Sequence, residues 1–266
     1  MPHYRVLNLG AGTQSSVLAL MCDRGDLPPV DVAIFADTQA EPKAVYDHLE
    51  WLKKQLRNTK VVTVTAGNLK TEAIEYQKYH VGTPAPYARY ASLPLYTLGG
   101  IQNRQCTKYY KIFPAERYVM ETMLGVGYGK RVKKGTVVTM VFGISFDERE
   151  RMRRPHRRWI INEYPLVDLR WNRHRVIAEG EKMFPGHKFP RSACKFCPWL
   201  RNEERLQHEP QEHQEACEFD DLVRRVDKST GVWIHPSLKP LRDVDLHEED
   251  SPLFGMVNEC EGMCGV

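Results

Sequence analysis

The sequence predicts an α/β protein with a doubly wound, mostly parallel sheet. Short apolar segments that suit buried strands alternate with segments whose apolar residues recur every three or four positions, the spacing of an amphipathic helix. A glycine-rich turn, LNLGAGTQSS (7–16), joins the first such strand to the first helix. This alternation favours parallel strands connected by right-handed crossovers through helices.

The first half of the chain contains three strand-like segments separated by two helical ones. The helix after the glycine turn is expected to end at Gly25, and Val45, Leu49 and Leu52 share one face of the next helix. In chain order the expected elements are a strand over 6–10, a helix over 15–25, a strand over 30–38, a helix over 44–56 and a strand over 60–66.

The middle of the chain begins with an irregular stretch. Prolines and glycines interrupt residues 80–105, which are predicted to form a long functional loop. The apolar segment 136–145 is expected to be an interior strand, because it is apolar on both faces. Further helices are expected over 108–124, 171–183, 202–208 and 212–226, followed by an extended acidic tail from Pro236.

Size and composition suit one substantial core. The chain has 266 residues, of which 42% are hydrophobic. We expect a nucleotide-binding α/β domain over 1–190 and a cysteine-containing helical extension with a mobile tail over 191–266. No apolar run approaches the ~20 residues that span a bilayer, and the first residues enter a strand, so a cytoplasmic protein without a membrane partner is expected.

Positive charge is concentrated in two segments, although the formal net charge is only +4. Six arginines lie within 149–158, and KRVKK occupies 130–134. Such clusters attract polyanions, so tRNA or DNA is a candidate partner. The alternatives are a solvated helix face, or arginines that serve the phosphates of a single nucleotide.

The glycine-rich turn is a candidate phosphate cradle. Small residues after a strand let backbone N–H groups face a ligand, and the following helix adds its positive N-terminal end. A turn of this kind can also be no more than a tight connection, and it matches neither GxGxxG nor the Walker A pattern. Gly10, Ala11 and Gly12 permit close backbone approach, and Thr13, Ser15 and Ser16 offer hydroxyl donors.

Several motifs, in order, resemble a known superfamily. GAGTQSS is similar to the SGGxDS loop of the PP-loop, or adenine nucleotide alpha-hydrolase-like, superfamily with its HUP-like Rossmannoid fold. FADT (35–38) resembles the DTG element of its PAPS reductase family. RQCTKYYKIFP (104–114), GISFDERERMR (143–153) and YPLVDLRWNRHRVIAEG (164–180) resemble further segments of that family. The chain is identified as a member of the superfamily, near a phage and bacterial subgroup with a GAGxQS loop.

The resemblance implies an adenine-nucleotide site. Asp37 and Thr38 would recognise adenosine, although Asp37 could equally cap a helix. Gly143, Glu148 and Arg149 correspond to the nucleotide-binding GxRxxExxxR segment. The chain departs from the pattern where Thr13 and Gln14 replace a basic and an acidic residue, and where Ser145 or Phe146 replaces the arginine of GxRxxE. A step that uses that acid to position a metal is therefore in question.

The cysteines form a pattern typical of metal binding in a reducing compartment. The chain has seven, and Cys194 and Cys197 form a CxxC. The resemblance implies that these two, together with Cys106, ligate a [4Fe-4S] cluster, with Cys260, Cys264 or an open iron completing it. Zinc is the alternative, because Cys194, Cys197, His208 and His213 read C-x2-C-x10-H-x4-H, close to a zinc-finger spacing. Thiols without a metal are the third possibility. His208 and His213 are expected to lie on a solvated helix.

The last residues, NECEGMCGV (258–266), resemble the mobile ECGxH tail of PAPS reductases. In that family the tail cysteine attacks the sulfonucleotide, which implies a catalytic role for Cys260. Cys264 would then resolve a disulfide or supply a cluster ligand. The alternative is a frayed terminus with free thiols.

Two classes of function follow. The first is a PP-loop enzyme of sulfur metabolism that binds ATP, APS or PAPS. It would be either a sulfonucleotide reductase served by a thioredoxin-like reductant or an ATP-dependent iron–sulfur sulfurtransferase that modifies tRNA or DNA. The second is a non-catalytic module that binds nucleotide and nucleic acid, for which Thr13 and Gln14 would be the signature.

Overall fold

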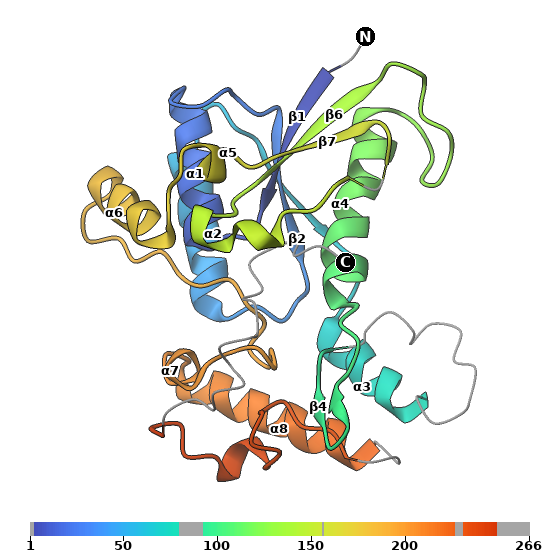
Figure 1. Cartoon of the computed structure of the whole chain (residues 1–266), viewed down its shortest axis with the longest axis vertical. Helices are drawn as coiled ribbons and strands as arrows, with labels where there is room; N and C mark the ends of the chain where they lie inside the picture. The colour runs from blue at the N-terminus through green and yellow to red at the C-terminus, as the bar shows by residue number, and fades with distance from the viewer. Residues whose placement is uncertain (1–2, 80–92, 156, 227–230, 249–266) are drawn as a thin grey trace.

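The computed structural model describes residues 3–79, 93–155, 157–226 and 231–248 (Figure 1). Its main unit is a five-stranded sheet in the order β3-β2-β1-β6-β7, in which every neighbouring pair is parallel. The doubly wound α/β class predicted from the sequence is confirmed. The strands are β1 (His3–Leu9), β2 (Val32–Asp37), β3 (Val61–Thr65), β6 (Val137–Phe142) and β7 (Ile160–Glu163).

Helices cover both faces of this sheet. On one face, α1 (Thr13–Arg24) and α2 (Lys43–Gln55) bury Leu18 and Leu52 against strand residues such as Phe35. The opposite face is covered by one continuous helical run that consists of the π-helical segment η2 (Lys108–Ile112), α4 (Phe113–Tyr118) and the π-helical segment η3 (Val119–Met123). Ala115 and Val119 of this run pack on Ile34 and Met140.

The element boundaries agree with the sequence periodicity where elements are long. Helix α1 ends at Gly25, which has φ +84° and so adopts the left-handed conformation that glycine tolerates best. Strand β6 lies between β1 and β7, so its predicted interior position is confirmed. The remaining helices near the sheet are η4 (Phe146–Arg151), a 3₁₀ helix, α5 (Pro165–Asp168) and α6 (Arg173–Met183).

The expected loop over 80–105 is partly wrong. Residues 80–92 lie outside the described residues, but β4 (Tyr96–Thr97) and β5 (Gly100–Ile101) form a short antiparallel hairpin. Tyr96 also pairs with Trp233 from the C-terminal part of the chain. Two-residue strands are too short to show an alternating pattern, which is why the sequence did not reveal them.

A second hydrophobic core lies beneath the sheet unit in Figure 1. It joins α3 (Leu69–Tyr79) to α8 (Pro210–Val226), with Leu95 and Phe196 between them. The predicted extension 191–266 therefore packs against residues from the first range, and the boundary at 190/191 stays a prediction. Two short helices, α7 (Asn202–Arg205) and the 3₁₀ helix η5 (Leu241–Asp243), complete this unit.

In the described part of the chain, every helix is too short or too polar to cross a bilayer.

Candidate functional site

The strand order creates a switch point between β1 and β6. The chain leaves β1 toward β2 on one side, while β6 lies on the other side of β1. Ligands of open α/β sheets bind outside the carboxyl ends of strands at such a point. The glycine turn follows β1 at this edge, and Gly143 follows β6, so the structure brings two of the predicted binding segments together.

Hydrogen bonds within the glycine turn hold its backbone conformation. Ala11 has φ +55°, and Gly12 is extended where α1 begins. The backbone N–H of Gly10 donates to Ser15 Oγ at 3.2 Å, and that hydroxyl donates to the carbonyl of Gly12 at 3.3 Å. Ser15 thus closes the turn on itself, and in this structure its hydroxyl is committed within the loop.

The other two hydroxyls also have protein partners. Thr13 Oγ1 donates to the carbonyl of Pro190 at 3.5 Å, and Ser16 Oγ shares a hydrogen bond with His48 Nε2 at 2.8 Å. His48 Nδ1 lies 2.9 Å from His187 Nε2, and burial, followed by the neighbouring His187, lowers the pKa of His48 to about 4. Thr13 also borders a cavity.

Gly143 holds the two strand ends close together. A Cβ built at this position would lie 2.8 Å from both the Cα and the N of Ser15 and 3.1 Å from the carbonyl carbon of Gln14. All three contacts are with backbone atoms at the start of α1. Unlike a flexible side chain, these atoms cannot move aside by changing rotamer. The close approach of β6 to the glycine turn therefore requires glycine at 143.

A buried polar network links α1 to the segment after β6. Gln14, which is fully buried, donates from Nε2 to Glu148 at 2.9 Å and to Ser145 Oγ at 3.4 Å. Arg151 is also buried and donates to the other oxygen of Glu148 at 2.7 Å. The Glu148 carboxylate therefore lies between the first turn of α1 and a buried guanidinium. Gln14 Oε1 is buried and has no hydrogen-bond partner among the described residues.

The end of β2 lies beside the CxxC segment. Asp37 accepts hydrogen bonds from Tyr46 at 2.8 Å and from the backbone of Gln39 at 2.7 Å. The next residue, Thr38, is buried, and its Oγ1 lies 3.5 Å from Cys194 Sγ. The predicted adenosine-binding strand end and the predicted metal ligand are thus in direct contact.

Cys106, Cys194 and Cys197 line one small cavity of about 20 Å³, together with Thr38 and Lys111. The two cysteines of the CxxC form a turn in which Cys197 N donates to the Cys194 carbonyl at 2.9 Å. Lys111 is buried against Glu41, with Nζ and Oε1 3.2 Å apart. The sequence therefore identified three thiols that share a cavity in the structure.

The three thiols border the cavity without forming a site for a single ion. Within the described residues, no group of three or more His, Cys, Asp and Glu side chains converges as a single metal ion requires. The thiolates of a cluster bind different irons and do not meet at one point. Burial raises the pKa of Cys194 well above its ordinary value, and the Glu41 carboxylate adds to the rise. A bound metal centre would hold this thiol in the thiolate form.

The proposed zinc-finger spacing is not assembled in the described part of the chain. His208 follows α7 and borders a different cavity, while His213 Nε2 lies 3.5 Å from Cys217 Sγ. Both histidines are half-buried. His213 lies on α8, in line with its predicted helical place, whereas His208 lies between α7 and α8 and not on a helix. Burial lowers the pKa of His208 to about 4.

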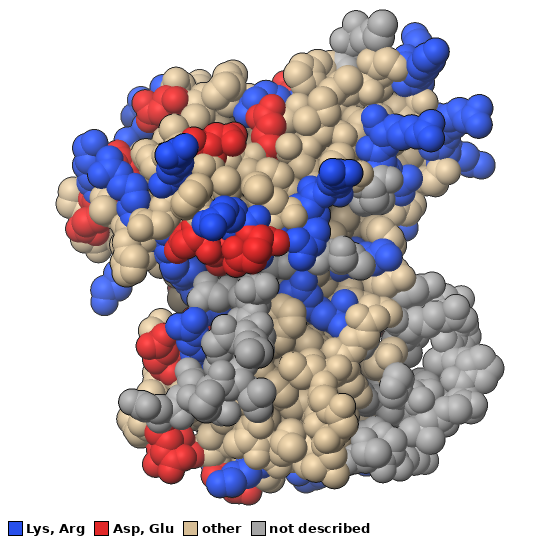
Figure 2. Space-filling view, in the orientation of Figure 1, with Lys and Arg blue, Asp and Glu red and all other residues tan. Residues whose placement is uncertain are grey.

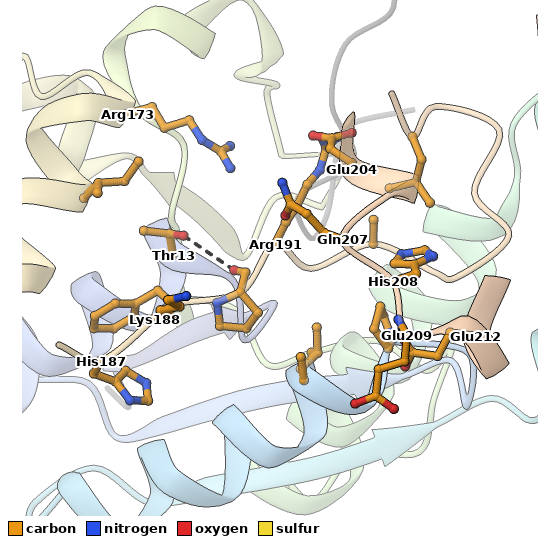
Figure 3. A pocket seen from close by; sticks show the side chains of 18 of the residues that line it. Thr13, Arg173, His187, Lys188, Arg191, Glu204, Gln207, His208, Glu209 and Glu212 are labelled. Atoms are coloured by element: carbon orange, nitrogen blue, oxygen red, sulfur yellow. Dashed lines mark hydrogen bonds and ion pairs between the residues drawn. The ribbon is translucent and has the colours of Figure 1, made fainter. Parts of the chain in front are cut away.

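A cavity of about 620 Å³ opens beside the glycine turn (Figure 3). Thr13 lies on one side of it, and Arg173 extends toward it from α6. Lys188 and Arg191 come from the segment that passes over α1, with Arg191 in contact with Glu204 of α7. The volume lies within the range of small-ligand sites. The lining is mixed in charge, because the cavity is also bordered by Glu181, Glu204, Glu209 and Glu212.

Arg149, Cys260 and Cys264 are the remaining residues that the sequence predicted for the site. Arg149 is exposed, with its guanidinium over the Phe146 ring at 4.9 Å, and lies outside the buried network. Cys260 and Cys264 lie outside the described residues. Sequence analysis missed Lys111, Glu41, Arg151, Arg173 and Lys188 as site residues. Lys111, Arg151 and Arg173 stand in the quoted segments 104–114, 143–153 and 164–180, which were the available signals. Glu41 and Lys188 become neighbours of the site only through the fold.

The sequence matches no protein-family model and no curated protein. Among solved structures, it resembles phosphoadenylyl-sulfate (PAPS) reductase from Candida auris in a phosphate complex, with 16% sequence identity and a TM-score of 0.40. The similarity covers 70% of this chain and 75% of that one. A likeness this distant assigns neither a family nor an activity to the chain.

Proposed function

We propose that this protein is an adenine-nucleotide-dependent enzyme of sulfur chemistry, with a thiol-ligated metal centre at Cys106, Cys194 and Cys197. The observation that carries the proposal is the contact between Thr38 and Cys194, because it joins the carboxyl edge of the sheet to the thiol cavity. A nucleotide bound at that edge would lie next to the thiols.

The nucleotide would lie at the switch point, with its phosphates toward the cavity beside Thr13. Arg173 and Lys188 supply positive charge there, and the N-terminus of α1 favours an anion. Asp37, which accepts from Tyr46, would contact the adenosine part. The half-buried Glu148 carboxylate accepts a hydrogen bond from Gln14 at the start of α1.

Cys106, Cys194 and Cys197 would hold a [4Fe-4S] cluster, with a fourth ligand from Cys264 or an open position. When bound, the cluster would supply a redox-capable centre beside the substrate. Lys111, which is paired with Glu41, and Arg104 bring cationic groups to the cavity, and Arg104 lies 4.4 Å over the Trp199 ring on its rim. These cations would hold the sulfonate or phosphate of a substrate near the thiols.

The first candidate reaction is the reduction of a sulfonucleotide such as APS or PAPS. The Cys260 thiolate would attack the sulfur of the sulfonucleotide. An S–S bond would form, the S–O bond would break, and the adenosine phosphate would leave with the bonding pair. A thioredoxin-like dithiol would then release sulfite from the cysteine and become a disulfide.

The second candidate is the ATP-dependent transfer of sulfur to a nucleic acid. Gln14 replaces the acid of the related loops, and an arginine-rich cavity lies close to the switch point. Both observations favour the transfer of sulfur to a nucleic acid over the reduction of a sulfonucleotide.

Anaerobic purification tests the proposal directly. We expect a broad absorption band near ~400 nm, with about four irons and equivalent sulfide per chain. Titration calorimetry with ATP, APS and PAPS would identify the nucleotide, and sulfite release from APS or PAPS would identify the reductase. Cys260→Ser should retain nucleotide binding and stop sulfite release. A colourless, iron-free protein that binds none of these nucleotides would refute the proposal.

A further inference from the structure

A second large cavity, of about 470 Å³, lies between the helical run η2–α4 and strands β6 and β7. It is separate from the thiol cavity and from the cavity beside Thr13. Its rim is basic, and one wall is aromatic. The residues that matter here are Lys108, Arg151, Arg153, Arg154, Arg157 and Tyr164.

The side chains that line this cavity carry more positive charge than negative charge. Glu116, the one carboxylate among its lining residues in the described part of the chain, is 3.1 Å from Arg157. Arg153 donates to backbone carbonyls at 2.6 and 3.0 Å. Lys108 and Arg154 have no acidic partner among the described residues, and Arg154 is exposed. The rim can therefore bind anions without first breaking an ion pair at these positions.

The wall of the cavity offers an aromatic surface. The Phe142 and Tyr164 rings stack with centroids 5.5 Å apart and an interplanar angle of 23°. The Tyr164 hydroxyl donates to the Arg153 carbonyl at 2.8 Å, which ties this surface to the basic segment. Aromatic rings next to cations are the combination that binds bases and phosphates of single-stranded nucleic acids.

Positive charge continues outside the cavity. Figure 2 shows Lys and Arg side chains over the upper right of the α/β unit, with no Asp or Glu among them on this face. Arg158 and Lys130, Arg131, Lys133 and Lys134 are exposed. The Arg157 guanidinium lies 5.8 Å from the ring centroid of Tyr128, which precedes the basic segment 130–134 by two residues. A single mononucleotide could not contact this whole surface, whereas a strand could follow it.

The cavity also adjoins the proposed reaction centre. Arg151 lines it and binds Glu148, which in turn accepts from Gln14 in the glycine turn. On η2, Lys108 and Ile112 face this cavity, while Lys111 faces the thiol cavity. A single helical segment separates the two spaces.

We infer that this cavity binds a nucleotide unit of a single-stranded nucleic acid, whose phosphates follow the basic surface outside. As a binding site the inference stands without the proposed function. As the acceptor site of a sulfur transfer it rests on the second candidate reaction.

Fluorescence anisotropy with a 5′-fluorescein-labelled 12-mer oligothymidylate, over a series of salt concentrations, tests the inference with the full chain. Arg153→Ala/Arg154→Ala should weaken binding about tenfold at low salt. The slope of log K against log salt should fall by about 1.4, since each lost phosphate contact removes about 0.7 on single strands. Lys108→Ala on the opposite rim should act in the same direction.

The matched control is Lys53→Ala/Lys54→Ala, which removes two charges from α2 on the other face of the sheet. It should leave the slope unchanged, and circular dichroism should show all variants folded. Thymidine monophosphate should compete with the oligonucleotide better than inorganic phosphate. Equal losses in both double variants, no loss in either, or equal competition by phosphate would overturn the inference. ATP binding, measured in parallel, should not change in the arginine variant, so the two proposals fail separately.

Discussion

The hydroxyl of Thr38 lies 3.5 Å from the sulfur of Cys194, although the two residues are 156 positions apart. Thr38 stands where β2 ends, and Cys194 opens the CxxC turn. Both side chains line the cavity that also contains Cys106. The end of β2 and the CxxC turn are therefore in direct contact, so a substitution in one is expected to affect the other.

Cys194→Ser should remove the metal centre. Oxygen is a poor ligand for a cluster that thiolates hold, and Cys194 shares its cavity with the two other proposed ligands. We expect loss of the visible band and at least a severalfold drop in iron per chain, measured after anaerobic purification.

The control for this variant is Cys22→Ala. Cys22 is buried on α1 within the hydrophobic core, where burial raises the pKa of its thiol to about 11. It should keep full iron and lose about 1 kcal/mol of stability from the removed sulfur. Full iron in Cys194→Ser would rule out the proposed ligation.

Gly143→Ala should destabilise the fold and impair nucleotide binding. The added methyl group would lie 2.8 Å from the backbone of Ser15. Backbone atoms in the first turn of a helix cannot shift far enough to relieve this clash. We expect the free energy of unfolding to fall by about 2–3 kcal/mol, the upper part of the range for overpacking. Denaturant unfolding and calorimetric nucleotide titration would measure the two effects.

Gly127→Ala is the matched control, because its nearest neighbour would be the flexible Lys130 side chain at 3.5 Å. It should change stability by less than about 1 kcal/mol. Comparable stability of the two variants would show that β6 and the glycine turn are not in contact as described.

Gln14→Glu should destabilise the protein in a pH-dependent way. The new carboxylate would face Glu148 at the 2.9 Å contact that Gln14 now makes. Two carboxylates in one buried site raise the pKa of one of them, so the native state binds a proton that the unfolded chain releases. The loss, about 3 kcal/mol at pH 8, should therefore shrink as the pH falls toward 5.

Gln14→Met tests whether charge is the cause. It removes the same hydrogen bond without adding a carboxylate, so its loss of stability should not vary over the same pH interval. A loss in Gln14→Glu that is equal at pH 8 and pH 5 would contradict the described position of Glu148.

Sequence patterns located the segments of the site but not its side-chain partners. The glycine turn follows from local chemistry, and the cysteine spacing marked three residues that share a cavity. Gln14 and Glu148 are 134 positions apart, and Lys111 meets Glu41 across 70. No periodicity encodes such pairs, because the fold alone brings them together. The arginines of 149–158 were visible as a cluster, but the aromatic wall behind them was not.

Stability should fall as the pH drops from about 6.5 to about 4. Burial lowers the pKa values of His48, His208 and His235 to about 4, below the value near 6.5 in an unfolded chain. In that interval the unfolded state binds more protons than the native state, so acid favours unfolding. Each histidine contributes a slope of up to about 1.36 kcal/mol per pH unit, which urea unfolding at several pH values would measure.

His48→Gln should reduce this slope, because it removes one of the buried imidazoles that must stay neutral in the native state. Glutamine can still bond to Ser16, which limits the structural loss. His174→Gln, on the exposed face of α6, is the control and should leave the slope as it is. An unfolding free energy that does not change between pH 6.5 and pH 4 would mean that these imidazoles are not buried. The link between the first turn of α1 and His187 through His48 would then be wrong.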